Sequence, residues 1–203
     1  MRATVRVGEY VWRPLTDSDA DTEFVVRLRN NERFRNMFYN TTVTPETHKK
    51  FIRAADERGE INWLIEQDGG QFVGLASMYH FDYTNRKAEC GRIAMLDPKL
   101  FHMNWMVSAF TGMDVVGTYK LWIETLEENH IVARGLERIG MVKEGLLRWH
   151  VIRDGKPINV WYFGGTTETW HSVGPGLIKR FGPPKLISFE GKKMLPPQPT
   201  LCL

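Results

Sequence analysis

The sequence has few of the features that mark secreted, membrane-bound or disulfide-rich proteins. It contains two cysteines, Cys90 and Cys202, among 203 residues, which is too few for a disulfide framework and fits a reducing compartment. No apolar run approaches the roughly 20 residues of a membrane span, and no leader pattern opens the chain. We therefore expect no membrane association and a cytoplasmic location, free or in a particle assembled in the cytoplasm.

Several motifs that identify common catalytic centres are also missing. The six histidines are scattered along the chain without the spacing of metal ligands, so we expect no metal site. The sequence has no Gly-x-Ser-x-Gly elbow, no Walker loop and no dinucleotide-binding fingerprint.

The positive charge is concentrated at the C-terminal end. From His171 onward five basic residues stand against one acid, so this segment carries +4 while the whole chain carries +3, which leaves about −1 for residues 1–170. A duplex nucleic-acid binder needs a concentrated basic face, which a near-neutral body does not provide. Nucleic acid is therefore not expected as a partner.

Length and composition suit one domain with a sizeable core, because 42% of the residues are hydrophobic and 25% are charged. Turn and cap residues divide the chain into short elements. Thr44, Pro45 and Glu46 form an expected helix start, and Asp68-Gly-Gly is typical of a hairpin turn. The pattern predicts strands over 7–14, 61–66, 71–79, 88–96, 119–124, 146–153 and 157–164, and helices over 19–30, 45–58 and 104–116.

The run from Asn129 to Arg148 predicts a further helix with clearly marked ends. Asn129 is a good N-cap residue, since its side-chain oxygen accepts a backbone amide of the first turn. Val132, Leu136 and Ile139 make one apolar stripe at helical spacing. Gly140 stands where a left-handed residue closes a helix. We expect Val132 and Leu136 to be buried.

This run resembles the signature Asn-x-x-(Ser/Ala)-x-x-Leu-x-Glu-Lys-x-Gly-Phe-x-x-Glu-Gly of the GNAT superfamily of acyl-CoA N-acyltransferases. The resemblance is closest to the branch that acetylates protein N-termini, aminosugars and polyamines. Glu9 to Ala20, Ala88 to Pro98 and Arg153 to Trp170 are similar to further family segments, in the family's order, over residues 7–170. The resemblance implies an α/β GNAT fold, with a mixed, mostly antiparallel central sheet that is splayed at its centre and flanked by helices.

Composition changes after Trp170, because six of the ten prolines lie in the last 33 residues. We therefore expect a GNAT-like acyltransferase domain over 1–170 and an extended Pro/Gly-rich arm over 171–203. The prolines argue against long helices in this arm. Its apolar residues would need cover, which suggests packing on the domain, on a second copy of the chain or on another protein.

The resemblance implies acetyl-CoA as co-substrate, and it assigns residues to the donor site. Asn129 resembles the residue that contacts the donor near its thiol, although capping the helix is a sufficient role for it. Asn104 would donate a side-chain hydrogen bond to the donor. The backbone that pairs with the pantetheine arm would come from Ile93, Ala94, Met95 and Leu96.

The family's pyrophosphate loop, Gln/Arg-x-x-Gly-x-Gly/Ala, has lost its glycines in this chain. The corresponding residues are Lys99 to Met106, with Phe101 at the position of the usual Arg or Gln. Glycine matters there because backbone amides must come close to phosphate oxygens. We expect that this loop presents no row of free amides, and that Phe101 and Trp105 pack across the pyrophosphate position.

The candidate proton acceptors are two glutamates, by the same resemblance. Glu89 resembles the base that many relatives carry on the fourth strand, and Glu124 ends the next strand. An ion pair with Arg92 or a nearby lysine is the structural alternative for each. Leu136 replaces the tyrosine that serves as acid in many relatives. Tyr79 and His80 end a strand where acceptor pockets usually open.

The resemblance implies acetyl-CoA-dependent N-acetylation of a primary amine, in an aminosugar, a peptide N-terminus or a polyamine. The missing glycines and tyrosine keep a second hypothesis open, in which a catalytically lapsed GNAT-fold protein serves as a structural component of a virion or another multi-subunit particle. Transfer from an aminoacyl-tRNA is a third, which the near-neutral body disfavours.

Overall fold

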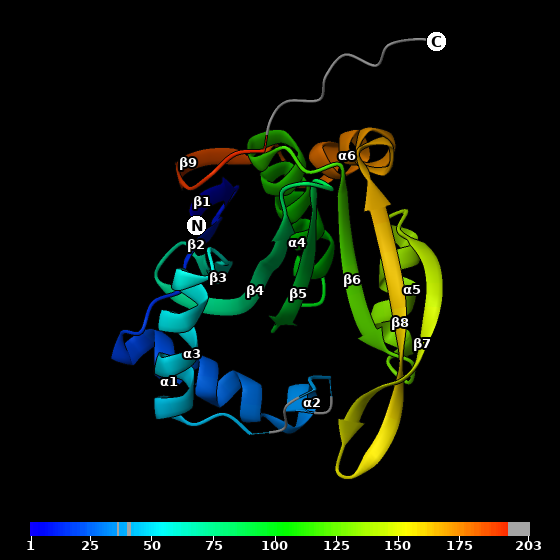
Figure 1. Cartoon of the computed structure of the whole chain (residues 1–203). Helices are drawn as coiled ribbons and strands as arrows, with labels where there is room; N and C mark the ends of the chain where they lie inside the picture. The colour runs from blue at the N-terminus through cyan, green and yellow to red at the C-terminus, as the bar shows by residue number, and fades with distance from the viewer. Residues whose placement is uncertain (36, 40–41, 195–203) are drawn as a thin grey trace.

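The computed structural model describes residues 1–35, 37–39 and 42–194 (Figure 1). Mixed α/β elements follow one another along these ranges, and no helix in them is long and apolar enough to cross a membrane. The elements are β1 (Arg2–Val7), β2 (Tyr10–Pro14), α1 (Asp19–Asn30), α2 (Glu32–Arg35), α3 (Pro45–Glu57), β3 (Ile61–Gln67), β4 (Gln71–Asp82), β5 (Lys87–Met95), α4 (Leu100–Ala109), the π-helix η1 (Phe110–Val116), β6 (Lys120–Leu126), α5 (His130–Arg138), β7 (Val142–Arg153), β8 (Lys156–Thr166), α6 (Thr167–Phe181) and β9 (Lys185–Glu190).

One sheet of nine strands holds the described residues together, in the order β7-β8-β6-β5-β4-β3-β2-β1-β9. Within the described ranges, every neighbouring pair of strands is antiparallel except β5 and β6. Parallel neighbours need a long crossover, and α4 with η1 provides it. The mixed, mostly antiparallel sheet flanked by helices is therefore confirmed.

The parallel pair is short. β5 and β6 pair only where Lys87, Ala88 and Glu89 face Lys120, Leu121 and Trp122, and the two strands then separate, as Figure 1 shows. A bulge bends β5 just beyond this point. Gly91 pairs with Ser77 while Ala94 pairs with Leu75, so β5 has one residue more than β4 between these pairs. Arg92 lies in the bulge with φ +52°. The predicted splay of the sheet is therefore present, and we call it the fork.

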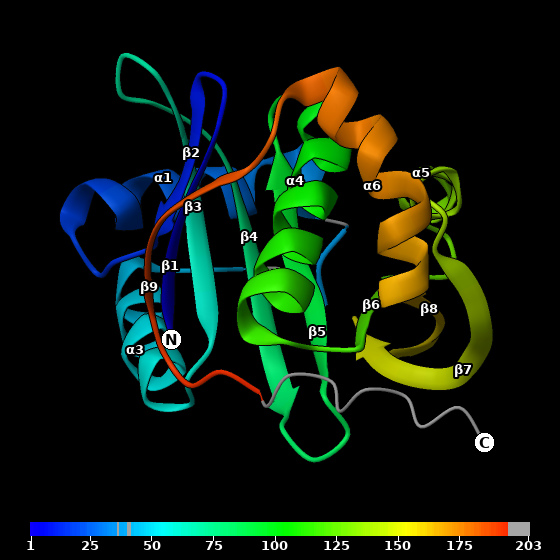
Figure 2. The same cartoon turned by 90° about the horizontal axis from the view of Figure 1, so that it is seen from above.

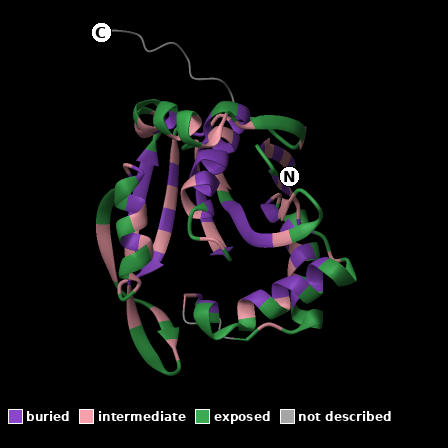
Figure 3. Ribbon diagram, turned by 180° about the vertical axis from the view of Figure 1, so that it is seen from behind, coloured by how far each residue is buried: buried purple, intermediate pink, exposed green. Residues whose placement is uncertain are grey.

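Helices cover the two faces of the sheet with separate apolar cores. On one face Phe24, Leu28 and Ile52 from α1 and α3 pack on Leu64 and Leu75 of the sheet. α4 and α6 contribute to the larger core on the opposite face, and Figure 2 shows α4 on the other side of β3 and β4 from α1 and α3. Figure 3 shows α1 buried along one side and exposed along the other, which is the pattern of an amphipathic surface helix.

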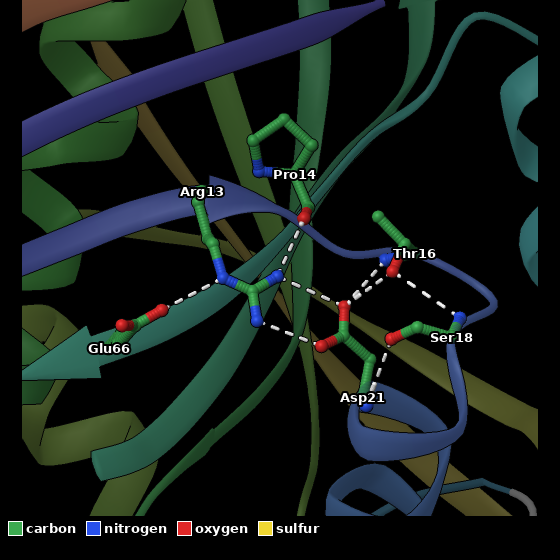
Figure 4. A network of polar contacts seen from close by, with 6 residues as sticks. All are labelled: Arg13, Pro14, Thr16, Ser18, Asp21 and Glu66. Carbon is green, nitrogen blue, oxygen red and sulfur yellow. Dashed lines mark hydrogen bonds and ion pairs between the residues drawn. The ribbon is translucent and has the colours of Figure 1, made fainter. Parts of the chain in front are cut away.

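A polar network fastens the start of α1 to the sheet (Figure 4). Arg13 of β2 donates two hydrogen bonds to the buried Asp21 carboxylate, at 2.8 and 3.0 Å, and one to Glu66 of β3 at 2.9 Å. Thr16 donates to Asp21 through both its amide and its hydroxyl. Burial by itself raises the pKa of Asp21, but the hydrogen bonds from Arg13 and Thr16 outweigh it and hold the pKa below its ordinary value.

The signature helix α5 has the predicted ends. Asn129 Oδ1 accepts from the amide of Val132 at 3.3 Å, and Gly140 has φ +79°. Leu136 is 0% exposed and Ile139 is buried, so the apolar stripe faces the core. Val132 is half-buried, because it lies at the edge of that stripe, and its predicted full burial is wrong.

The C-terminal segment differs most from the prediction. The expected extended form is wrong over 171–181, because α6 continues through this range despite Pro175. A capping box between Thr166 and Thr169 starts the helix, and the Trp170 indole donates to Asp114 at 3.0 Å. Leu177, Ile178 and Phe181 are partly buried against the core. This packing offsets the backbone hydrogen bond that Pro175 cannot donate.

Beyond α6 the chain is extended, as predicted, and β9 pairs with β1 at the edge of the sheet. Leu186 and Ile187 of β9 are exposed, while Phe189 packs against the core. Residues 195–203, which include Pro196, Pro197, Pro199 and Cys202, lie outside the described residues.

The other differences concern element boundaries. The strand expected over 7–14 is a hairpin of β1 and β2 around Gly8, which has φ +55°. The helix expected from Asn104 begins at Leu100 instead, so the residues compared with a pyrophosphate loop are helical.

We predict that Leu136→Ala lowers the free energy of unfolding by about 2–5 kcal/mol, the range for truncating a core leucine. Ile131→Ala on the same helix is the matched control, because Ile131 is 80% exposed and its change should stay within about 0.5 kcal/mol. Denaturant unfolding measures both. Equal midpoints for the two variants would contradict the packing of α5.

Candidate active site

A cleft with a volume of about 1360 Å³ opens where β5 and β6 separate. β5 contributes Glu89 and the residues after it, and β6 contributes 122–125. The segment after α2 lies at the open end of the fork in Figure 1, and it adds residues 37–39 to the walls. The first turn of α4, the side of α5 that carries Val132 and Gly135, and the far end of the β7–β8 hairpin complete the lining. The gap in the sheet at the fork is therefore part of a cleft that these elements share.

Glu89 lies at the last paired position before the fork. It faces Trp122 of β6 and Tyr79 of β4. Tyr79 Oη donates to one carboxylate oxygen at 2.6 Å, and His80 Nδ1 lies 2.8 Å from the other. His80 has φ +51° at a bulge in β4, which brings its ring to the same carboxylate as the ring of Tyr79. Two aromatic side chains thus orient the Glu89 carboxylate.

The environment of Glu89 makes it a stronger proton acceptor than an exposed glutamate. Glu89 is only 6% exposed, and this burial raises the pKa of its carboxyl group. The hydrogen bonds from Tyr79 and His80 act in the opposite direction, and the negative charge of Glu124 raises the pKa further. The net pKa lies above the ordinary value, so the carboxylate has a greater affinity for a proton.

The ion pair between Glu89 and Arg92, which was the structural alternative, does not form. Arg92 instead hydrogen-bonds Glu60, which precedes β3, and its guanidinium stacks 3.8 Å from the centre of the Tyr79 ring. Glu89 therefore has hydrogen-bond partners but no arginine or lysine among the described residues.

Glu124 of β6 is the second carboxylate in the cleft. It accepts a hydrogen bond from Tyr39 Oη at 3.0 Å, and His150 Nε2 lies 3.4 Å away. Burial, followed by the charge of Glu124, raises the pKa of Tyr39, so its phenol stays protonated. No lysine pairs with Glu124 among the described residues. The structure thus brings Glu89 and Glu124 to the two strands of one fork.

Four of the six residues assigned to the donor line this cleft: Ile93, Ala94, Met95 and Asn129. The first three belong to the half of β5 that has no β6 partner. Leu96 lies outside the lining, and its carbonyl accepts from Arg33 Nη1 at 3.3 Å. Asn104 is buried in the core, where it accepts from the Trp12 indole at 2.9 Å. The structure does not bring these last two residues into the cleft.

The start of α4 confirms that this segment offers no row of free amides. The amide of Lys99 donates to Asp97 Oδ1 at 2.9 Å, that of Leu100 to the Asp97 carbonyl at 3.1 Å and that of Phe101 to the Pro98 carbonyl at 3.2 Å. An anion at this helix start would have to displace local hydrogen bonds.

Phe101 lies in the cleft beside Gly135 of α5, where an added Cβ would come within 2.9 Å of its ring. Trp105 packs near Gly165 in the core and not in the cleft, so the expected packing of Trp105 across a phosphate position is wrong. His102 and Arg138 line the same end of the cleft as Phe101. Burial lowers the pKa of His102, and the charges of Arg180 and Arg138 lower it further.

Sequence reasoning missed the partners of the two glutamates. The sequence marks Tyr79 and His80 as the end of a strand but not as hydrogen-bond partners of Glu89. The register of the β4–β5 hairpin places Tyr79 opposite Glu89, while His80 reaches it from the bulge that follows. Tyr39 and His150 reach Glu124 from 85 and 26 residues away, in a short loop and a hairpin. No local pattern in the sequence signals such contacts.

Comparisons with known proteins agree with this architecture. A family model described as an acetyltransferase (GNAT) domain matches residues 11–142. No curated protein matches the sequence.

Among solved structures, the chain is similar to a spermidine N-acetyltransferase from Vibrio cholerae in complex with CoA and spermine, with a TM-score of 0.71, 16% identity, and coverage of 80% of this chain and 98% of that chain. It is also similar to a GCN5-related N-acetyltransferase from Brucella melitensis, with a TM-score of 0.75, 17% identity, and coverage of 88% of this chain and 85% of that chain. For a putative acetyltransferase from T. thermophilus the TM-score is 0.73 and the identity is 20%, with coverage of 89% of this chain and 97% of that chain. At these identities the likeness shows the fold.

The raised pKa of Glu89 predicts a pH-dependent effect of Glu89→Gln on stability. Folding raises this pKa above 4.5, so protonated Glu89 contributes to the free energy of unfolding at low pH. That contribution is lost as the pH rises through the folded pKa. The variant has no such loss. Its unfolding free energy relative to wild type should therefore be greater at about pH 8 than at about pH 3. Urea unfolding at both pH values measures the difference.

Asp21→Asn is the control with the opposite sign, because folding lowers the pKa of Asp21 and its stabilisation is present above 3.8. Its unfolding free energy relative to wild type should fall as pH rises. If Glu89→Gln followed the same trend as Asp21→Asn, the environment assigned to Glu89 would be wrong.

Proposed function

The chain belongs to the GNAT acetyltransferase family, and we propose that it transfers the acetyl group of acetyl-CoA to the nitrogen of a primary amine. The observation that carries this proposal is the fork, with one carboxylate on each of its strands and unpaired backbone beyond them. A fork of this kind offers a place for an extended donor next to a group that accepts a proton.

The unpaired half of β5 suits the amide-rich arm of coenzyme A. The amide of Leu96 donates to the Val73 carbonyl of β4. Neighbouring amides along a strand point to opposite edges, so the amide of Met95 points to the edge that β6 has left. A buried backbone group without a partner is costly, which favours pairing with the amides of a bound pantetheine arm.

The phosphates of the donor need a different partner from the usual glycine loop. Because the first amides of α4 already have acceptors, we assign the phosphate contacts to the side chains of Arg138 and His102 at that end of the cleft. Asn129, which caps α5 and also lines the cleft, would contact the donor nearer to its reactive end. Acetyl-CoA supplies an activated acetyl thioester when it binds.

The two carboxylates supply the proton chemistry. An amine arrives mainly as an ammonium ion and must lose a proton before its nitrogen attacks a carbonyl carbon. Glu89 accepts that proton, while Tyr79 and His80 hold its carboxylate in place. Glu124 attracts the ammonium from the opposite strand. As the new C–N bond forms, the C–S bond breaks, the nitrogen loses its second proton and the leaving sulfur gains one, which yields an amide and the free thiol of coenzyme A. Leu136 of α5 cannot supply a proton, because its side chain is a hydrocarbon.

The alternative of a non-catalytic component of a virion or another particle finds no support in the comparisons, and we do not propose it. The features that motivated it have local explanations. The glycine-free segment is the first turn of a helix, and the residues after Trp170 belong partly to α6 and β9.

The direct test is to incubate the purified chain with acetyl-CoA and a panel of primary amines, and to measure the free thiol that is released. Acetyl-CoA at 100 times its dissociation constant should also raise the free energy of unfolding by about 2.7 kcal/mol. A chain that neither binds acetyl-CoA nor releases thiol with any amine would contradict the proposed function.

We predict that Glu89→Gln lowers kcat by about 100- to 10,000-fold, the range for removing a general base. The KM for acetyl-CoA should change by less than about twofold, because Glu89 does not bind the donor. The wild-type rate should rise with pH through the raised pKa of Glu89, since only the carboxylate accepts a proton.

Glu23→Gln is the matched control, because Glu23 is exposed on α1 and lies outside the cleft. It should leave kcat unchanged. A Glu89→Gln variant that keeps the wild-type kcat would remove Glu89 from the mechanism.

A further inference from the structure

The end of the cleft formed by α1 and α3 contains a cation, Arg29, that has no counter-ion among the residues that the structure describes. Arg29 of α1 lines the cleft, and its guanidinium carbon lies 3.6 Å from the centre of the Phe38 ring. Its buried Nε has no hydrogen-bond partner, and no carboxylate pairs with it, among the described residues. Burial, followed by the charge of Arg92, lowers the pKa of Arg29 to about 10. The contact with Phe38 is therefore its main described compensation for lost water.

The neighbouring cation does not share this need. Arg92 hydrogen-bonds Glu60, which neutralises it, and it also stacks on Tyr79. Tyr79 in turn donates to Glu89. Arg29 thus lines the same cavity as Glu89, the proposed base. The charge of its neighbour Arg92 acts on it, and Arg92 contacts the Tyr79 that bonds Glu89.

His48 of α3 adds a second unsatisfied group to this end of the cleft. It is 4% exposed and lines the cavity, yet its Nε2 has no hydrogen-bond partner among the described residues. Burial lowers its pKa and so favours the neutral ring. In the tautomer that carries hydrogen on Nε2, the ring can donate one hydrogen bond to a ligand.

The charges around the cavity disfavour an acceptor that is purely cationic. Among the lining residues that the structure describes, five are arginines and three are acidic. The acids are Glu89 and Glu124 at the fork and Asp154 on the hairpin, so none of the acidic lining residues belongs to the α1–α3 end. Glu60 neutralises Arg92 from outside the lining, which leaves the charge of Arg29. A polyamine would bring like charge to this end. A buried cation without a partner is instead stabilised by a ligand that carries negative charge.

We propose that the acceptor is an amine that also carries an oxyanion group, either a carboxylate or a phosphate, and that Arg29 and His48 bind this group. The amine of the same molecule then lies at Glu89 and Glu124. This inference rests on the proposed acetylation at the fork for the position of the amine, while the anion site itself rests on Arg29 and His48.

The activity test compares amines that differ in the oxyanion. Glucosamine 6-phosphate is compared with glucosamine for a phosphate, phenylalanine with phenylalaninamide for a carboxylate, and spermidine serves as the purely cationic amine. In at least one pair the anionic member should have a kcat/KM at least about 10-fold higher than that of its partner and of spermidine, in line with a charge-assisted hydrogen bond. The pair that shows the preference identifies the oxyanion. Preference for spermidine, or in both pairs for the member without an oxyanion, would overturn the proposal.

Arg29→Met keeps an apolar stem against Phe38 and removes the charge, and it should abolish most of this preference. Arg29→Lys keeps the charge and should retain part of it, which separates loss of charge from loss of folding. Arg27→Met is the matched control, because Arg27 is exposed on the same helix and outside the cleft. It should behave as wild type. The proposal fails if Arg29→Met raises the KM for acetyl-CoA instead, because Arg29 would then bind the donor.

A binding measurement keeps this inference separate from the proposed function. With saturating coenzyme A present, inorganic phosphate or acetate should raise the melting temperature of wild type and Arg27→Met but not of Arg29→Met. This result supports the anion site even if no amine is acetylated, in which case only the proposed function fails. Equal shifts in all three proteins, or no shift in any, would overturn the anion site.

Discussion

The site depends on one constraint in the sheet, which is that β5 and β6 pair over three residues and then separate. Strands in a continuous sheet satisfy each other's backbone groups and leave no space between them. Here the crossover through α4 and η1 makes the pair parallel, and the bulge at Arg92 bends β5 beyond the last pair. The separation creates both the cavity and an edge of unpaired backbone within the sheet. The candidate site residues lie where these two consequences meet.

The fork also gives its two carboxylates different surroundings. Glu89 is held by Tyr79 and His80 on its own side of the fork, and burial raises its pKa. Glu124 is held by Tyr39 and His150, which come from segments at the open end. One carboxylate is thus fixed within the sheet and the other contacts the more exposed wall. This asymmetry is the physical reason for assigning proton acceptance to Glu89 and attraction of the ammonium to Glu124.

Elements with strong local signals could be predicted from the sequence. The cap at Asn129, the stripe through Leu136 and the left-handed Gly140 define α5 within one short run, and Thr44 with Pro45 defines the start of α3. The C-terminal helix α6 could not be predicted from composition, because Pro175 by itself disfavours a helix. Packing on residues distant in the sequence stabilises the helix, and composition does not report such packing. Long-range contacts explain the differences at the site as well. The sequence offers an ion pair with Arg92 as the structural alternative for Glu89, but Arg92 bonds Glu60. The resemblance assigns Asn104 to the donor, but Asn104 accepts from Trp12, 92 residues away.

Amide hydrogen exchange with and without acetyl-CoA reports on the unpaired edge of β5 itself. If this edge binds the donor, acetyl-CoA slows exchange at Met95, whose amide points to the edge that β6 has left. Amides in the middle of β3, which pair on both sides, should change little. Unchanged exchange at Met95 on saturation with acetyl-CoA, with slowing confined to the first turn of α4, would contradict the role assigned to the fork.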